Sequence, residues 1–78
     1  MDAVVPVAGF TVPLGRQRIE LAQVDFAAGG MRLLRVRIRE GHRFTVFDVD
    51  PGTAAEWGRA MQDWARAQDG DARPGEDR

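Results

Sequence analysis

The chain is most constrained by the run from Met31 to Val49, MRLLRVRIREGHRFTVFDV. Its first half alternates apolar residues with arginines, and this period of two puts the two kinds of side chain on opposite faces of a β-strand. Its second half is rich in Phe, Thr and Val, which favour strands. Between them, Gly41 and His42 suit a two-residue type II′ loop, because glycine accepts the positive φ of the first loop position. The run therefore predicts an antiparallel hairpin.

A two-residue loop fixes the register of this hairpin. Glu40 lies opposite Arg43, and one face is consistently apolar, with Ile38, Val36 and Leu34 opposite Thr45, Phe47 and Val49. The other face sets Arg39 opposite Phe44, Arg37 opposite Val46 and Arg35 opposite Asp48. A slip by one residue would place arginines among the apolar residues, so this register is favoured.

The second face of the hairpin carries the candidate functional residues, and we name it the arginine face. It combines arginines with apolar side chains, a mixture enriched at the cores of protein interfaces. We expect its partner-binding residues to be Leu33, Arg35, Arg37, Arg39, Phe44 and Val46. The alternative is a solvated face, on which the arginine stems lie over the apolar residues and keep their charged heads in water.

The segments before this hairpin predict further strands. Residues 1–8 are expected to form a loose arm, and residues 9–14 (GFTVPL) an edge strand, because Pro13 has no N–H to donate to a ladder. Residues 18–26 (RIELAQVDF) predict a strand whose apolar alternation changes parity near Ala22. Either a β-bulge near Ala22 or partial cover on both faces would explain that change.

A helix is predicted after residue 50. Asp50 is a good N-cap and Pro51 suits the first helical position. Apolar side chains recur at three- and four-residue spacing and form one stripe, which consists of Ala54, Trp57, Met61, Trp64 and Ala65. The helix should end near Gln68, with Gly70 as its stop, and residues 69–78 (DGDARPGEDR) are expected to be a disordered tail.

Together these elements predict an α+β fold, a three- to four-stranded antiparallel meander followed by one C-terminal helix packed on one sheet face. Residues 9–68 would form the single domain. Trp57 and Trp64 are expected in its core, with an interface position for one of them as the alternative. One helix covers only part of a sheet, and the second face is not wholly polar. We therefore expect a second copy or a larger partner to cover the remainder.

Size and composition limit how this chain can be stabilised. A chain of 78 residues forms one small domain, and such a domain buries only about 60% of the surface that its unfolded chain exposes. There is no cysteine, so neither disulfides nor a cysteine-based metal site supports the fold. All eleven basic residues are arginine, which indicates GC-rich coding and a bacterial source. No signal peptide and no run of about 20 apolar residues is evident, so we expect a cytoplasmic protein without a membrane partner.

Catalytic, cofactor and metal chemistry have few candidates in this sequence. There is no Cys, Lys, Tyr or Ser, and His42, the single histidine, is expected in an exposed turn. Asp48 and Asp50 share a strand face, but a metal site needs more oxygen ligands than these two. No phosphate-binding glycine pattern is present. We expect no catalytic, cofactor-binding or metal-binding residues and no activity from this chain alone, although it could complete the active site of a partner subunit.

The leading functional expectation is a non-enzymatic protein-interaction module, either a homodimer or a small accessory subunit of a larger bacterial complex. The alternative is nucleic-acid binding through the arginine face. Residues 31–43 hold five arginines against Glu40, a net charge of +4, and two-stranded ribbons can enter a DNA groove. Against this alternative stand the total charge of −1 and the nearby Asp25 and Asp48.

One long run of the chain also carries a resemblance. The run RIEL…GGMRLLRVRIREGHRFTVFDVDPGTAAEWGRAMQDWA covers about residues 18–65 and resembles a group of short uncharacterised bacterial proteins, a domain of unknown function. The shared features are the arginine-alternating strand, the Gly turn, the Asp-Pro helix start and the Trp-Gly helix. The group has no assigned activity, so the resemblance implies an arrangement of elements and no function.

Overall fold

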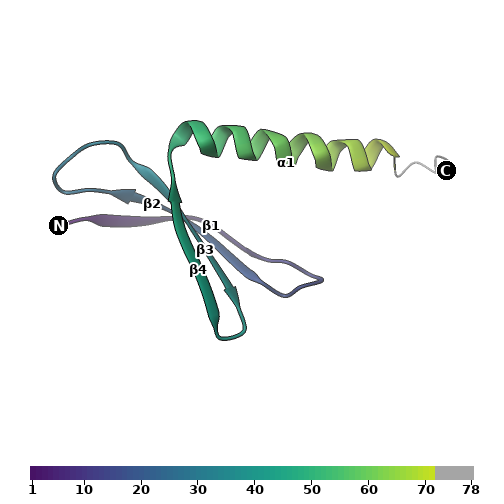
Figure 1. Ribbon diagram of the computed structural model, residues 1–78, viewed down its shortest axis with the longest axis horizontal. Coiled ribbons are helices and arrows are strands. Elements are labelled where there is room, and N and C mark those ends of the chain that lie inside the picture. Colours follow the sequence, from purple (N-terminus) through teal and green to yellow (C-terminus); the bar gives the residue numbers. More distant parts are fainter. Residues whose placement is uncertain (72–78) are drawn as a thin grey trace.

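The computed structural model describes residues 1–71 and has the expected α+β architecture (Figure 1). Four antiparallel strands form a meander in the order β1-β2-β3-β4, so each strand pairs with its neighbour in the sequence. One C-terminal helix follows and packs on the sheet. The elements are β1 (Ala3–Thr11), β2 (Arg18–Asp25), β3 (Leu33–Glu40), β4 (Arg43–Val49) and α1 (Pro51–Asp71).

The central hairpin has the register that its loop length predicts. Glu40 pairs with Arg43, and the pairing continues without a shift to Leu34 opposite Val49. Gly41 has a φ of 61°. Within residues 1–71, Arg16 is the one non-glycine residue with a positive φ, so His42 lies outside that region. A type II′ turn has this combination, whereas a type I′ turn needs a positive φ at both loop positions.

The first strand begins earlier than the sequence suggests. Residues 1–8 were expected to be a loose arm, but β1 starts at Ala3 and pairs with β2 along its whole length. Backbone pairing outweighs the interruption by Pro6, because an edge strand tolerates a missing N–H on its open side. The strand ends at Thr11, so Leu14 lies in the following turn and is 98% exposed.

The irregularity expected near Ala22 lies in the opposite strand. The β1–β2 register shifts between Pro6 and Ala8, which leaves Val7 as an additional residue in β1, while β2 pairs regularly with β3. The parity change within β2 instead reflects partial cover on both faces. Leu21 lies on the helix side of the sheet, and Val24, of opposite parity, is 2% exposed.

The helix begins as predicted and ends later. Asp50 caps it, since its carboxylate accepts a hydrogen bond from the Thr53 backbone N–H at 3.1 Å and another from the Thr53 hydroxyl. The helix continues past Gln68 to Asp71, so the first three residues of the predicted tail are helical. A single glycine lowers helix propensity without ending a helix, and no proline follows Pro51 until Pro74. The rest of that tail, residues 72–78, lies outside the described residues.

The core of the described residues is small. Val24 and Val36, each 2% exposed, are its buried apolar side chains, and they lie on opposite faces of the sheet. The helix reaches the sheet only through its first turns, where the ring centroids of Trp57 and Phe47 are 6.0 Å apart. Figure 1 shows the remainder of α1 running away from the strands, and Trp64 is 67% exposed. The helix therefore packs on one sheet face, but neither tryptophan is buried in the core as expected, since Trp57 is 42% exposed.

Candidate functional site

Two uncovered surfaces lie on opposite faces of the sheet. The first is the arginine face, and the strand register brings its six predicted residues to one side of β3 and β4. Phe44 and Val46 are 52% and 51% exposed there. The second is an apolar groove between the helix and the other face, with a volume of about 280 Å³. Its lining residues are Phe10, Ile19, Leu21, Leu34, Val36, Ile38, Ala54, Trp57, Gly58 and Met61.

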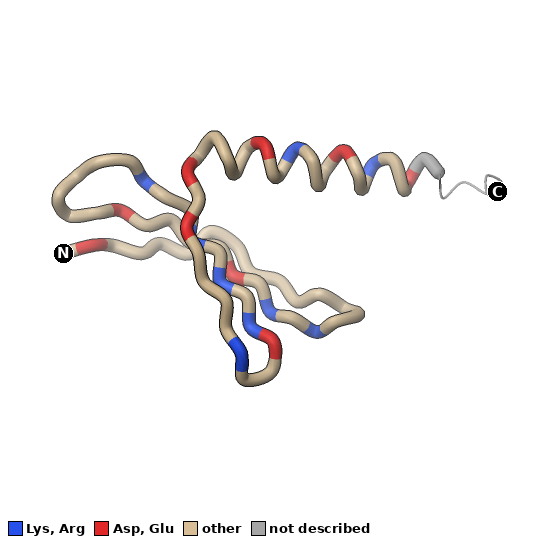
Figure 2. Tube along the Cα trace, in the orientation of Figure 1, with Lys and Arg blue, Asp and Glu red and all other residues tan. Residues whose placement is uncertain are grey.

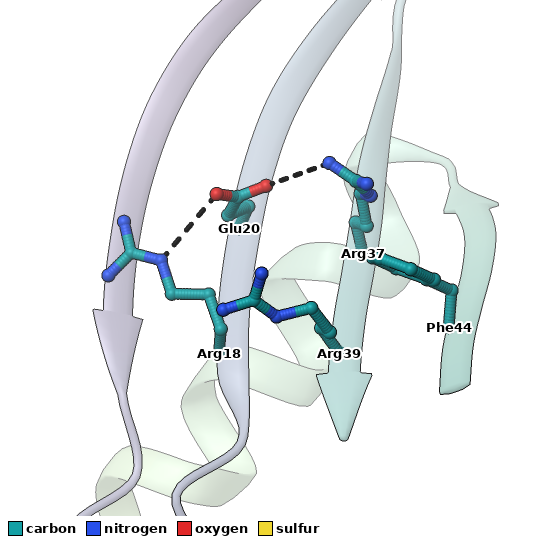
Figure 3. A pocket seen from close by; sticks show the side chains of 5 residues that line it. All are labelled: Arg18, Glu20, Arg37, Arg39 and Phe44. Atoms are coloured by element: carbon teal, nitrogen blue, oxygen red, sulfur yellow. Dashed lines mark hydrogen bonds and ion pairs between the residues drawn. The ribbon is translucent and has the colours of Figure 1, made fainter. Parts of the chain in front are cut away.

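A shallow pocket of about 100 Å³ marks the arginine face (Figure 3). Its lining combines Arg37, Arg39 and Phe44 with Arg18 and Glu20 from β2. Glu20 bridges two arginines, with its oxygens 3.3 Å from Arg37 and 3.5 Å from Arg18. The guanidinium carbon of Arg37 lies 4.6 Å from the centroid of the Phe44 ring, a cation–π contact. The sequence did not identify Arg18 and Glu20, because the β2–β3 register could not be fixed from the loop.

Arg35, at the far end of this face, is engaged within the chain. Its Nε and one terminal nitrogen donate to the two oxygens of Asp48, at 2.8 and 3.0 Å. The hydrogen bonds from Arg35, together with its charge, hold the pKa of Asp48 below its ordinary value. The pKa of Arg35 is raised, first by the hydrogen bonds to Asp48 and then by its charge. An incoming anion would have to compete with Asp48 for this arginine.

The arginine face carries a modest positive charge. Arg18, Arg35, Arg37 and Arg39 stand against Glu20 and Asp48, a net of +2. Arg39 makes no ion pair among the side chains described, residues 1–69. Figure 2 shows basic residues gathered on the central strands, whereas acidic and basic residues alternate along the helix. This face can therefore bind an anionic or aromatic group mainly through Arg39 and the exposed ring of Phe44.

The apolar groove is the larger of these two surfaces. The sequence predicted that one helix would leave part of the sheet uncovered, but it did not predict where. The tryptophan stripe was expected to cover this face, but the helix closes only one side of it. Phe10 on the far strand is 49% exposed, and Trp57 and Met61 on the helix wall are 42% and 52% exposed. None of the lining residues carries a charge. One helix cannot cover four strands, and this rule predicts incomplete cover without locating the uncovered area.

The other polar side chains considered as candidates are exposed or hold local structure. His42 is exposed in the β3–β4 turn. Asp50 is engaged as the helix cap, and the hydrogen bonds from Thr53 lower its pKa. Residues 1–71 contain no group of three or more His, Asp or Glu side chains that could hold a metal ion. In the same part of the chain, no helix combines the length and apolarity needed to cross a bilayer.

Comparison with known proteins places the chain in a family without supplying an activity. A family of unknown function (DUF6967) matches residues 1–67, which include the whole sheet and most of the helix. The chain belongs to this family. No curated protein matches the chain, and no solved structure matches it either.

Proposed function

We propose that this protein is a non-enzymatic protein-interaction module that completes its hydrophobic core with another polypeptide. It would act as a homodimer or as a small accessory subunit of a larger bacterial complex. The observation that carries the proposal is the uncovered apolar groove. Large apolar side chains remain exposed around it, while only Val24 and Val36 are buried in the described part of the chain.

The energetics favour an added partner. Apolar surface removed from water contributes about 25 cal/mol per Å², and small domains without disulfides or metals commonly rely on oligomerisation for stability. An open groove without charged residues loses little on desolvation, because no ion has to leave water. The groove is therefore a better candidate for a buried interface than the arginine face, where ion pairs would be desolvated.

The test is the mass of the protein in solution, measured by light scattering coupled to size exclusion at several concentrations. Two single variants determine which of the two surfaces forms the interface. Met61→Arg places a charge in the groove, and Phe44→Glu places one on the arginine face. We expect the first to dissociate the complex and the second to leave it intact. A chain that stays monomeric at every concentration and retains no partner from its host would refute the proposal.

Nucleic-acid binding through the arginine face remains a second candidate, supported by Arg39 and by the net charge of +2. Phosphate contacts by these arginines would make affinity fall steeply with salt. Fluorescence anisotropy with labelled DNA and RNA at low salt measures this directly, and Arg39→Gln should lower both the affinity and the salt dependence. Absence of binding to either nucleic acid at low salt would exclude this candidate.

A further inference from the structure

The apolar stripe of α1 extends beyond its own sheet. Trp57 contacts Phe47 of β4, whereas Trp64 lies further along the same helix and is 67% exposed. At 1.5 Å per residue, the two tryptophans are separated by about 10 Å along the axis. Figure 1 shows no strand beside the C-terminal half of the helix. The sheet of the same chain therefore cannot cover Trp64.

The sheet in turn has apolar residues that its own helix leaves uncovered. The helix side chains that line the groove come from the first three turns of α1, between Ala54 and Met61. Across the groove, Phe10 on β1 is 49% exposed, and Ile19 and Leu21 on β2 are half-buried. Each chain thus has part of a sheet face that its own helix does not cover, and part of a helix stripe that its own sheet does not cover.

We propose that the occupant of the groove is a second copy of this chain. Two helices run antiparallel about a two-fold axis, and the C-terminal half of each, with Trp64, packs against Ile19 and Leu21 of the other copy. This inference rests on the proposed function and specifies its partner. A two-fold interface uses the same patch on both subunits, which must be complementary to itself. The groove and the stripe of one chain fulfil that condition.

The exposed area is consistent with a stable dimer. Five side chains dominate it, with exposed fractions of 49%, 38%, 42%, 52% and 67% for Phe10, Phe47, Trp57, Met61 and Trp64. Taking about 200 Å² for each large side chain, they expose roughly 500 Å². A standard interface buries about 800 Å² per partner, so neighbouring aliphatic and alanine residues need to supply only the remainder.

Gly58 leaves room for the close approach of another chain. A β-carbon built on Gly58 meets no atom within 4 Å, so the space beside it is open in the described part of the chain. Glycine weakens a helix interior relative to alanine, and Gly58 lies in the groove wall between Trp57 and Met61. A second helix packed against this wall would explain the glycine, because a residue without a side chain allows two backbones to approach closely.

The first experiment uses tryptophan emission as a local probe. The chain has two tryptophans, so Trp57→Phe leaves Trp64 as the single emitter. We expect blue-shifted emission at high protein concentration and a shift to the red on dilution, with the same midpoint as dissociation measured by light scattering. Emission typical of water at every concentration, in a sample that is dimeric by mass, would overturn the inference.

The second experiment compares dimer dissociation constants. Hot-spot tryptophans weaken an interface about 30-fold or more when truncated, and a two-fold dimer contains two, so Trp64→Ala should weaken association roughly 1,000-fold. Gly58→Ala should strengthen the isolated helix and yet weaken the dimer. Arg59→Ala is the control, because the helical period places Arg59 opposite the apolar stripe, and it should leave the constant unchanged. Circular dichroism verifies that each variant folds.

The outcomes distinguish this inference from the proposed function. If neither Trp64→Ala nor Gly58→Ala weakens the dimer, the inference is overturned. The proposed interaction function is then retained, and the dimer interface lies elsewhere on the chain. A monomer that binds a different protein through the groove has the same consequence. A monomer that binds no partner overturns both.

Discussion

Substitution of Val36 directly tests how much its buried side chain contributes to the free energy of unfolding. Val36 is 2% exposed and lies between Leu21 on β2 and Phe47 on β4. Val36→Ala removes two methyl groups, and at about 0.8 kcal/mol per buried carbon the lost transfer free energy is about 1.6 kcal/mol. An unrelaxed cavity of about 50 Å³ would add about 1 kcal/mol. Because Val36 also lines the open groove, part of that space is reached by solvent, and we expect a total near 2 kcal/mol.

The assay is urea unfolding at one fixed protein concentration, because association would otherwise change the apparent stability. Val46→Ala is the matched control, since it makes the same substitution on β4 at a side chain that is 51% exposed. It should cost about 0.8 kcal/mol, half of the transfer free energy and no cavity. Both variants lose the same strand preference of valine, so their difference of about 1 kcal/mol reports burial alone. Equal losses in the two variants would refute a core centred on Val36.

Three further predictions concern the local features that fix the fold. Gly41→Val should destabilise the protein by about 1–2 kcal/mol in thermal unfolding, because a β-branched residue is strained at a φ of 61°. The pKa of Asp48 is lowered below 3.8 by Arg35, so their pair stabilises the fold above that pH and ceases to do so as pH falls through the lowered pKa. Asp48→Asn should flatten this acid-side loss in urea midpoints measured from pH 7 to 2, and an unchanged slope would contradict the assignment. Asp50→Ala should reduce helical circular dichroism, while Asp50→Ser restores it, because serine can still accept from the Thr53 N–H.

The sequence predicted those elements whose signals are local. The alternation from Leu34 to Arg39, with one glycine at the turn, determines the register of β3 and β4. The side chain of Asp50 and the ring of Pro51 determine where the helix starts. These features depend on residues within a few positions of each other, so no tertiary contact is needed to infer them.

The sequence failed where the outcome depends on pairing between distant segments. Val4 and Val5 form part of a strand because they pair with Val24 and Gln23 of β2. Arg18 and Glu20 join the arginine face because of the β2–β3 register, which the glycine-containing loop does not reveal. The groove went unpredicted for a related reason, since the apolar spacing of a helix shows which side is buried but not how far its neighbour extends.

The two edges of the sheet have different capacities for growth. On β1, Pro6 and the irregularity at Val7 break the row of donors that another strand would need, whereas β4 presents Arg43–Val49 without a proline or a bulge. A strand can therefore be added beside β4 but not beside β1. If two copies paired through their β4 edges, β1 would form both outer edges of the combined sheet. No further strand could then pair, because Pro6 and the irregularity at Val7 interrupt the β1 edge. Pro6 and the irregularity at Val7 thus limit edge-to-edge growth of the sheet at β1.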